Sequence, residues 1–302
     1  MSLTRRHFLK TAGIFTISTM VIPLEGCFGA INSKIRIGLV TDSHYADREP
    51  NNTRYYRQSI EKMDEFITLM NLEKVDFVMH MGDFKDEDAN KNKIDTLKYL
   101  QAIEASYSKF KGPKYHCVGN HDVDSITKEE FLNNIDNTGI PKHKSYYSFN
   151  QSGFHIVVLD ANFDKQGNNH FFKEGADWQD TNIPKIQLDW LKQDLATNDL
   201  PVIVFCHHPL FEYFRAGKKY HINNYSEVQL ILKNSAKVVG VFQGHVHEEK
   251  YKEHKGMHFI TQLGMVDYSG LENNSFSIVE IDENSIVING FKRANNYNFP
   301  VQ

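Results

Sequence analysis

Five apolar, strand-like runs in this chain each end next to a cluster of polar residues that contains His, Asp or Asn. The runs cover residues 35–40, 77–81, 115–118, 202–205 and 238–242. The clusters are Asp42-Ser43-His44, Gly82-Asp83, Gly119-Asn120-His121-Asp122, His207 in a Cys-His-His-Pro segment, and Gly244-His245-Val246-His247. Because the ends of successive strands in an α/β sheet meet along one edge, the chain is constrained to a fold that brings these clusters together.

Length and composition favour one large globular domain. The chain has 302 residues, and the polar clusters extend from residue 42 to residue 247, which is too long a span for one small domain. Hydrophobic residues make up 40% of the chain, which is enough for a substantial core. We therefore expect one folded domain over residues 35–302.

Strand and helix signals alternate in the first part of this domain, and paired strands dominate the last part. Apolar residues at helical spacing predict helices over residues 56–70, 94–103, 184–195 and 225–232. The strands with hairpin or short-turn signals are 146–149, 154–159, 257–262, 276–281 and 285–289. Thr53 is expected to cap the first helix, and the polar stretch 161–183 predicts a long loop. This order predicts an α/β (α+β) fold of two packed sheets with helices outside.

The first residues of the chain have the pattern of an export signal. Residues 4–10, which include Arg5-Arg6, resemble the twin-arginine export motif, and the apolar stretch that follows is too short for a membrane span. Leu24-Glu25-Gly26-Cys27 resembles a bacterial lipobox. We expect residues 1–26 to be the signal, residues 27–34 a tether, and the mature protein a periplasmic or cell-envelope lipoprotein held to the membrane through lipidated Cys27. The alternative is an uncleaved N-terminal anchor.

The net charge indicates whether the protein binds nucleic acid, and the positions of the cysteines indicate whether a disulfide forms. The formal net charge is −4, and no basic run occurs beyond the N-terminus, so we expect no nucleic-acid partner. Cys117 and Cys206 lie in or at the end of strand-like runs, which predicts two buried free thiols rather than a disulfide. The oligomeric state does not follow from the sequence.

Two of the polar clusters contain candidate metal ligands two residues apart. In an extended segment residues i and i+2 point the same way, so Asp42 and His44 can bind one ion together. The same geometry lets His245 and His247 project to one side. Each residue taken alone fits a surface loop better than a site. Their joint occurrence with the other clusters, each after a strand, favours a shared site.

The other clusters supply single candidate ligands. Asp83 follows Gly82 where the backbone must turn, and a carboxylate there can bridge two cations, although Asp is also a common turn residue. Asn120 offers a neutral carbonyl oxygen. His207 and His208 are adjacent and should point in opposite directions, so only one of them can join the site. Imidazole, carboxylate and amide groups without a thiolate suit Mn, Fe or Zn better than Mg.

Together these clusters resemble the motifs of the calcineurin-like metallophosphoesterase superfamily, D-x-H, G-D-x-x-D, G-N-H-D/E, H and G-H-x-H, along residues 35–260. The resemblance implies a β-sandwich of two mixed sheets flanked by helices, and a centre with two divalent metal ions, Mn, Fe or Zn. It assigns one ion to Asp42, His44, Asp83 and His247. It assigns the other to Asp83, Asn120, His207 and His245, so that Asp83 is shared.

The resemblance also implies a reaction. Two ions about 3.5–4 Å apart lower the pKa of a water held between them, and the resulting hydroxide attacks phosphorus in line with the leaving group. The leaving oxygen needs a proton or a hydrogen bond, for which His121 is the candidate donor. Asp86, the second acid of G-D-x-x-D, matches the residue that orients this histidine. The alternative for Asp86 is a solvated member of the acidic run 86–88.

A second resemblance concerns the segment Arg54-Tyr55-Tyr56-Arg57-Gln58-Ser59. It is similar to a segment of the manganese-dependent ADP-ribose/CDP-alcohol diphosphatases, although it also fits the amphipathic start of a helix. We therefore expect an exported phosphohydrolase that cleaves a phosphodiester or diphosphate bond in a small, nucleotide-like phosphorylated substrate. The alternatives are a cyclic-nucleotide phosphodiesterase or phosphomonoesterase of the same superfamily, or a non-catalytic periplasmic binding protein.

Overall fold

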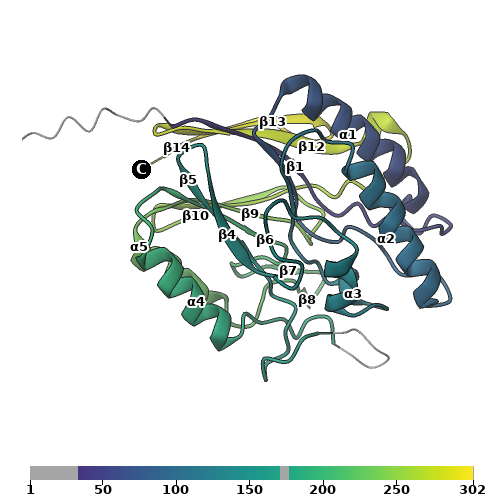
Figure 1. Cartoon of the computed structure of the whole chain (residues 1–302), viewed down its shortest axis with the longest axis horizontal. Coiled ribbons are helices and arrows are strands. Elements are labelled where there is room, and N and C mark those ends of the chain that lie inside the picture. The colour runs from purple at the N-terminus through teal and green to yellow at the C-terminus, as the bar shows by residue number, and fades with distance from the viewer. Residues whose placement is uncertain (1–32, 171–176, 302) are drawn as a thin grey trace, which may run out of the picture. The chain divides into compact units, whose positions relative to one another are not determined.

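The structure is a computed structural model that describes residues 33–170 and 177–301. In this part of the chain two six-stranded sheets pack face to face, with helices on their outer faces (Figure 1). No helix among the described residues is long and apolar enough to cross a membrane. The expected export signal and Cys27 lie outside the described residues.

The first sheet has the strand order β14-β13-β12-β1-β2-β3. Its strands are β1 (Ile35–Val40), β2 (Phe77–His80), β3 (Lys114–His116), β12 (Ser275–Ile281), β13 (Ser285–Lys292) and β14 (Tyr297–Pro300). β1, β2 and β3 are parallel, whereas β12 pairs with β1 in the antiparallel direction. The sheet is therefore mixed, with the parallel strands carrying the first three polar clusters.

The second sheet has the strand order β10-β11-β9-β6-β5-β4 and is also mixed. Its strands are β4 (Tyr147–Gln151), β5 (Phe154–Leu159), β6 (Val202–Cys206), β9 (Val238–Gln243), β10 (Lys250–His254) and β11 (Met257–Thr261). β5, β6 and β9 are parallel, and β6 and β9 carry the last two clusters. A separate small hairpin pairs β7 (Phe214–Arg215) with β8 (Lys218–Lys219).

The helices form the outer layers. The longer helices are α1 (Ser59–Glu73), α2 (Lys93–Tyr107), α4 (Lys185–Ala196) and α5 (Tyr225–Ser235). α1 and α2 pack on the first sheet, where Phe66, Ile103 and Val78 belong to one buried cluster, and α4 and α5 pack on the second (Figure 1). The short segments are the helix α3 (Lys128–Asn133) and the 3₁₀ turns η1 (Tyr56–Gln58), η2 (His121–Val123) and η3 (Leu271–Asn273).

The core between the sheets confirms the predicted sandwich. Ile37 and Phe77 of the first sheet belong to one buried cluster with Ile156, Phe205 and Phe242 of the second. At roughly 25 cal/mol per Å² of buried apolar surface, such side chains are the main stabilising contribution to the packing of the two sheets. The predicted α/β architecture of two mixed sheets with flanking helices is therefore confirmed.

Several local predictions can be compared with the structure. All four predicted helices and the predicted hairpin of β4 and β5 are present, and Cys117 and Cys206 are buried free thiols. The capping role predicted for Thr53 is wrong, because its hydroxyl donates to Asp267 at 2.8 Å and α1 begins after η1 without a side-chain cap. α3 was not predicted. It begins with a capping box formed by Thr127 and Glu130 and is too short to show a helical repeat.

Candidate metal centre

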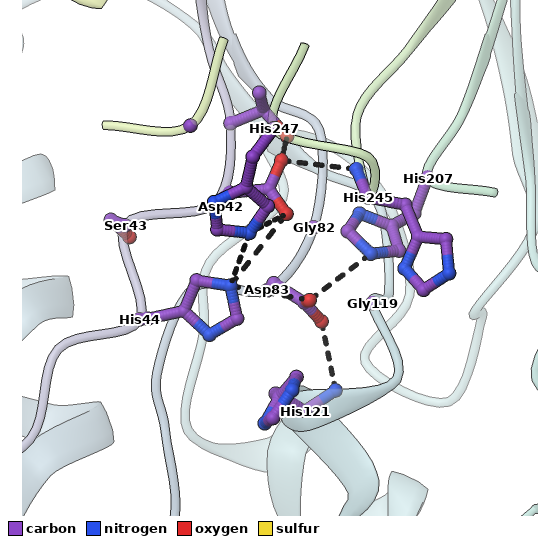
Figure 2. Close-up of polar contacts among 12 residues, drawn as sticks. Asp42, Ser43, His44, Gly82, Asp83, Gly119, His121, His207, His245 and His247 are labelled. Atoms are coloured by element: carbon purple, nitrogen blue, oxygen red, sulfur yellow. Dashed lines mark hydrogen bonds and ion pairs between the residues drawn. The ribbon is translucent and has the colours of Figure 1, made fainter. Parts of the chain in front are cut away.

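The five polar clusters meet where the strand ends of both sheets approach one another. Figure 2 shows the side chains of Asp42, His44, Asp83, His207 and His247 pointing toward a common centre. Backbone hydrogen bonds join the loops: the Asp42 N–H donates to the Gly82 carbonyl at 3.0 Å, and the Gly244 N–H donates to the His207 carbonyl at 3.0 Å. Ligand candidates from four separate strands are thus held by the main chain.

One group of atoms forms around Asp42 and two histidines. The Nε2 atoms of His44 and His247 are 3.1 Å apart. Asp42 Oδ1 lies 3.6 Å from His44 Nε2 and 3.3 Å from His247 Nε2. Asp83 Oδ2 lies 3.4 Å from His44 Nε2. These four atoms are close enough to surround one cation, and they belong to the four residues assigned to the first ion.

A second group forms on the other side of Asp83. The same Oδ2 atom lies 3.3 Å from His207 Nε2, and the rings of His207 and His245 are 5.1 Å apart. Asn120 lies next to His121, whose N–H donates to Asp83 Oδ1 at 2.8 Å. Asp83, His207 and His245 each present an atom within 4.8 Å of the others, which is a spacing suited to a metal ion. Asp83 therefore takes part in both groups.

Buried polar atoms without hydrogen-bond partners support a metal site at this position. Four buried atoms at the centre lack a hydrogen-bond partner: Asp42 Oδ1, Asn120 Oδ1, His207 Nε2 and His245 Nε2. A buried polar atom without a partner costs roughly 1–3 kcal/mol, so several in one place call for a ligand that they share. Nitrogen and oxygen donors with no thiolate fit Mn, Fe or Zn. The donor set of the chain thus fits a pair of divalent ions.

The backbone conformation of the ligand candidates differs from the prediction. The sequence predicts extended segments here, in which residues i and i+2 lie on the same side. Asp42, His44, Asp83, His245 and His247 instead have φ between 44° and 69°, in the left-handed region. Such residues cost of order 1–3 kcal/mol each and occur mainly at functional sites. Asp42 and His44 belong to the same group of candidate ligands, whereas His245 and His247 belong to different groups.

Three of the histidines are also held through their second ring nitrogen. Nδ1 of His247 is 2.8 Å from Asp267 Oδ2, and Nδ1 of His44 is 3.2 Å from Asp86 Oδ2. Nδ1 of His207 is 2.8 Å from the carbonyl of Met81. Such contacts fix the ring orientation and leave Nε2 free to bind a metal.

Comparison with known proteins agrees with this geometry. Residues 35–249 match the calcineurin-like phosphoesterase family. The chain belongs to the calcineurin-like phosphoesterases. As a member of this family it is a metal-dependent enzyme that hydrolyses phosphoester bonds, and the prediction of this reaction class is confirmed.

Similar proteins cover most of this phosphoesterase. It is 24% identical to the manganese-dependent ADP-ribose/CDP-alcohol diphosphatase of Arabidopsis thaliana, over 87% of this chain and 96% of that protein. It is 26% identical to a Fibrobacter succinogenes protein named as a "probable cyclic nucleotide phosphodiesterase", over 71% of this chain and 73% of that protein. A crystal structure of a dimetal phosphatase from Danio rerio superimposes with a TM-score of 0.73 at 19% identity, covering 90% of this chain and 100% of that chain.

The resemblance assigns His121 to neither ion of this phosphoesterase, although one of its ring nitrogens lies within 4.8 Å of atoms of His44 and Asp83. Its Nδ1 is 3.5 Å from Asp86 Oδ2 and 3.4 Å from Asp124 Oδ2. Burial lowers the pKa of His121, but the negative charges of Asp86 and Asp83 outweigh burial and hold this pKa well above its usual value. Asp86 is 2% exposed, so the alternative of a solvated carboxylate is excluded for this residue.

Sequence reasoning missed several residues that shape this site. Asp267 and Asp124 each contact a site histidine, but both stand outside the recognised motifs. Asp122 is part of the G-N-H-D motif, and its carboxylate accepts hydrogen bonds from the N–H groups of Asp83 and Gly119 at 3.0 and 2.7 Å. It thereby joins two of the metal-site loops. The position of Asp122 in the G-N-H-D motif could have identified it from the sequence. Asp267 could not be identified in this way, because it belongs to none of the polar clusters that follow the predicted strands.

A cleft of about 600 Å³ opens beside the centre. Its lining includes His245, His247 and the basic residues Arg54, Arg215, Lys218 and Arg293. Tyr220, also in the lining, packs against His245 and Trp178 with ring centroids 5.4 and 5.3 Å apart. Positive charge and aromatic surface thus adjoin the candidate metal site, a combination suited to phosphate groups carried on an organic molecule.

Proposed function

We propose that this phosphoesterase cleaves the diphosphate bond of a small nucleotide-like molecule, with two divalent ions held between Asp42, His44, Asp83, Asn120, His207, His245 and His247. The proposal that the cleaved bond is a diphosphate rests on the similarity to the Arabidopsis diphosphatase, which extends over 96% of that protein. The basic and aromatic lining of the cleft supports the choice, because a diphosphate carries more negative charge than a single diester.

The ions would activate a water molecule and neutralise negative charge on the phosphoryl group. The residues of the chain hold the geometry for this chemistry. Asp83 Oδ2 reaches both groups of ligands, and Asp267 and Asp86 fix two of the histidine rings. His121 is assigned to neither ion and would donate a proton to the leaving oxygen. Asp86 and Asp124, at 3.5 and 3.4 Å, would keep its imidazole protonated and oriented.

The test of the reaction is turnover with Mn²⁺ on ADP-ribose, CDP-choline, cyclic AMP and nitrophenyl phosphates. We expect the two diphosphates to give the highest kcat/KM. His121→Ala should lower turnover on them by about 10²–10⁴-fold while metal content stays the same. The loss should be smaller for nitrophenolate, which leaves without a proton. Equal losses for good and poor leaving groups would contradict the role of His121.

A second candidate function is cyclic-nucleotide phosphodiesterase activity, favoured by the similarity to the Fibrobacter succinogenes protein. The two candidates differ in the charge that the substrate brings to the cleft. A cyclic monophosphate has one phosphate group and would bring less negative charge to the basic residues that line the cleft. A higher kcat/KM for cyclic AMP than for both diphosphates would replace the first proposal with this one.

The location of the enzyme is a separate part of the proposal and rests on the N-terminal sequence. Arg5-Arg6 and the segment that ends at Cys27 support export and lipidation. Cell fractionation of a Cys27→Ser variant tests the lipid tether, which should be lost. If the variant stays in the membrane fraction like the parent, an uncleaved anchor is the better account. Replacement of Arg5 and Arg6 with Lys should block export.

A further inference from the structure

Arg54 is placed beside the metal centre by two loops. Its N–H donates to the Asn51 carbonyl at 3.0 Å, and its backbone also pairs with Asp267. The next residue, Tyr55, donates its N–H to the Val266 carbonyl at 3.0 Å. The loop that fixes His247 through Asp267 therefore also fixes the position of Arg54. Its side chain lies in the lining of the cleft and is 31% exposed.

The guanidinium of Arg54 has donors that form no hydrogen bond with any residue that the structure describes. Within residues 33–170 and 177–301 its one ion pair is Nη1 to Asp86 Oδ2 at 3.6 Å, which is too long for a hydrogen bond. Arg48 on the same carboxylate is different: its Nη1 lies 2.9 Å from Asp86 Oδ1, and its guanidinium stacks 5.0 Å from the Tyr56 ring. The guanidinium of Arg48 is therefore held by contacts within the protein, whereas that of Arg54 can bind a ligand in the cleft.

Arg54 and His121 share one atom of Asp86. Oδ2 is 3.6 Å from Arg54 Nη1 and 3.5 Å from His121 Nδ1. The proposed proton donor and the guanidinium of Arg54 therefore lie on the same side of the metal centre. A group that leaves next to His121 is within reach of Arg54.

We propose that Arg54 binds the departing phosphate of a diphosphate substrate and so selects diphosphates over simple diesters. The inference rests on the proposed function. In the reaction the oxygen of water bonds to the attacked phosphorus, and the bond from that phosphorus to the bridging oxygen breaks. The attacking water gives up a proton to solvent, and the electron pair of the broken bond stays on the bridging oxygen, which takes the proton that His121 donates. The departing phosphate keeps the negative charge of its other oxygens. Arginine remains protonated and binds phosphate oxygens in a bidentate manner, which offsets this charge.

The experiment compares Arg54→Gln with the parent on ADP-ribose and on bis(p-nitrophenyl) phosphate, both with Mn²⁺. The second compound is a diester whose leaving group has no phosphate. We expect kcat/KM for ADP-ribose to fall by roughly 10- to 150-fold, the range for a hydrogen bond to a charged group. For the diester we expect less than about a 3-fold change. Arg54→Lys should recover part of the loss, because it keeps the charge without the bidentate geometry.

Two matched arginines serve as controls. Arg57 belongs to the same segment but pairs with Asp47 and Glu49 at the surface, so Arg57→Gln should leave both activities unchanged. Arg48→Gln disturbs Asp86 without removing the cation from the cleft, and it should change both activities by the same factor. Calorimetry with AMP on metal-free protein adds a readout without turnover. Arg54→Gln should weaken AMP binding, whereas Arg57→Gln should not.

The outcomes separate this inference from the proposed function. If the parent hydrolyses the diester but not the diphosphates, the proposed function fails before Arg54 is tested. If the parent hydrolyses diphosphates and Arg54→Gln loses both activities equally, Arg54 acts on the attacked phosphate or on Asp86, and the inference is overturned. An unchanged kcat/KM for ADP-ribose, or unchanged AMP affinity, would also overturn it.

Discussion

Lys62 on α1 is a buried cation that supports the metal site from a distance. Its Nζ donates to the backbone carbonyls of Met265, Asp267 and Tyr268 at 2.9, 3.1 and 2.7 Å. The side chain is fully buried. These carbonyls belong to the loop after β11, which also contains Asp267, and the Asp267 carboxylate contacts Nδ1 of His247. Replacing Lys62 with Met removes a titratable group and three donors while keeping an unbranched side chain that is one atom shorter.

The expected effect on stability depends on pH in a definite direction. Burial, and then the charge of Arg293, lower the pKa of Lys62 from 10.5 to about 8. Between these two values the unfolded chain binds more protons at Lys62 than the folded protein, so the free energy of unfolding rises with pH across this window. A difference of about 2.5 pH units corresponds to about 3 kcal/mol. The Lys62→Met variant lacks this contribution, so its stability deficit relative to the parent should grow by that amount.

The assay is urea unfolding of metal-free parent and variant protein between pH 7.5 and 10, followed by circular dichroism. Metal must be absent because its binding adds a stabilisation of its own. Lys62→Arg is the matched control: it keeps a cation and donors but titrates above the window, so its deficit should also grow with pH from a smaller starting value. A difference between parent and Lys62→Met that stays constant or shrinks with rising pH would refute the reasoning.

Three further substitutions test the centre itself. Asp83→Asn should reduce bound metal from near two equivalents to less than one, because Asp83 Oδ2 lies next to candidate ligands of both ions. Elemental analysis that still finds two ions per chain would contradict this role of Asp83. Asp267→Asn should weaken metal affinity by about 10–100-fold in calorimetry, since His247 Nδ1 loses its carboxylate partner, and an unchanged affinity would exclude this support. Gly119→Ala should lower the unfolding free energy by about 1–3 kcal/mol or more, because the added Cβ would lie 2.1 Å from the Asp83 nitrogen; an unchanged Tm would rule out that clash.

Much of the fold followed from local patterns in the sequence. The apolar runs 35–40 and 202–205 predict the buried strands β1 and β6, and the spacing of Met63, Ile67 and Met70 predicts α1. The polar clusters at the strand ends predict one shared site, because the parallel strand ends of a sheet must meet. These inferences depend on contacts between neighbours in sequence and on the general geometry of sheets, so a single sequence contains them.

The details of the centre depended on contacts between distant parts of the chain. The left-handed backbone at Asp42 and His247 comes from the way the loops of two sheets bond to each other, and local sequence gave no sign of it. Thr53, predicted as a cap, instead donates to Asp267, a residue 214 positions away in sequence. Likewise, only the packing of α1 against the loop after β11 made Lys62 a support for the metal site. Sequence by itself determined which side chains could bind metal, whereas the tertiary structure decided how each is oriented, because orientation depends on hydrogen bonds across hundreds of residues.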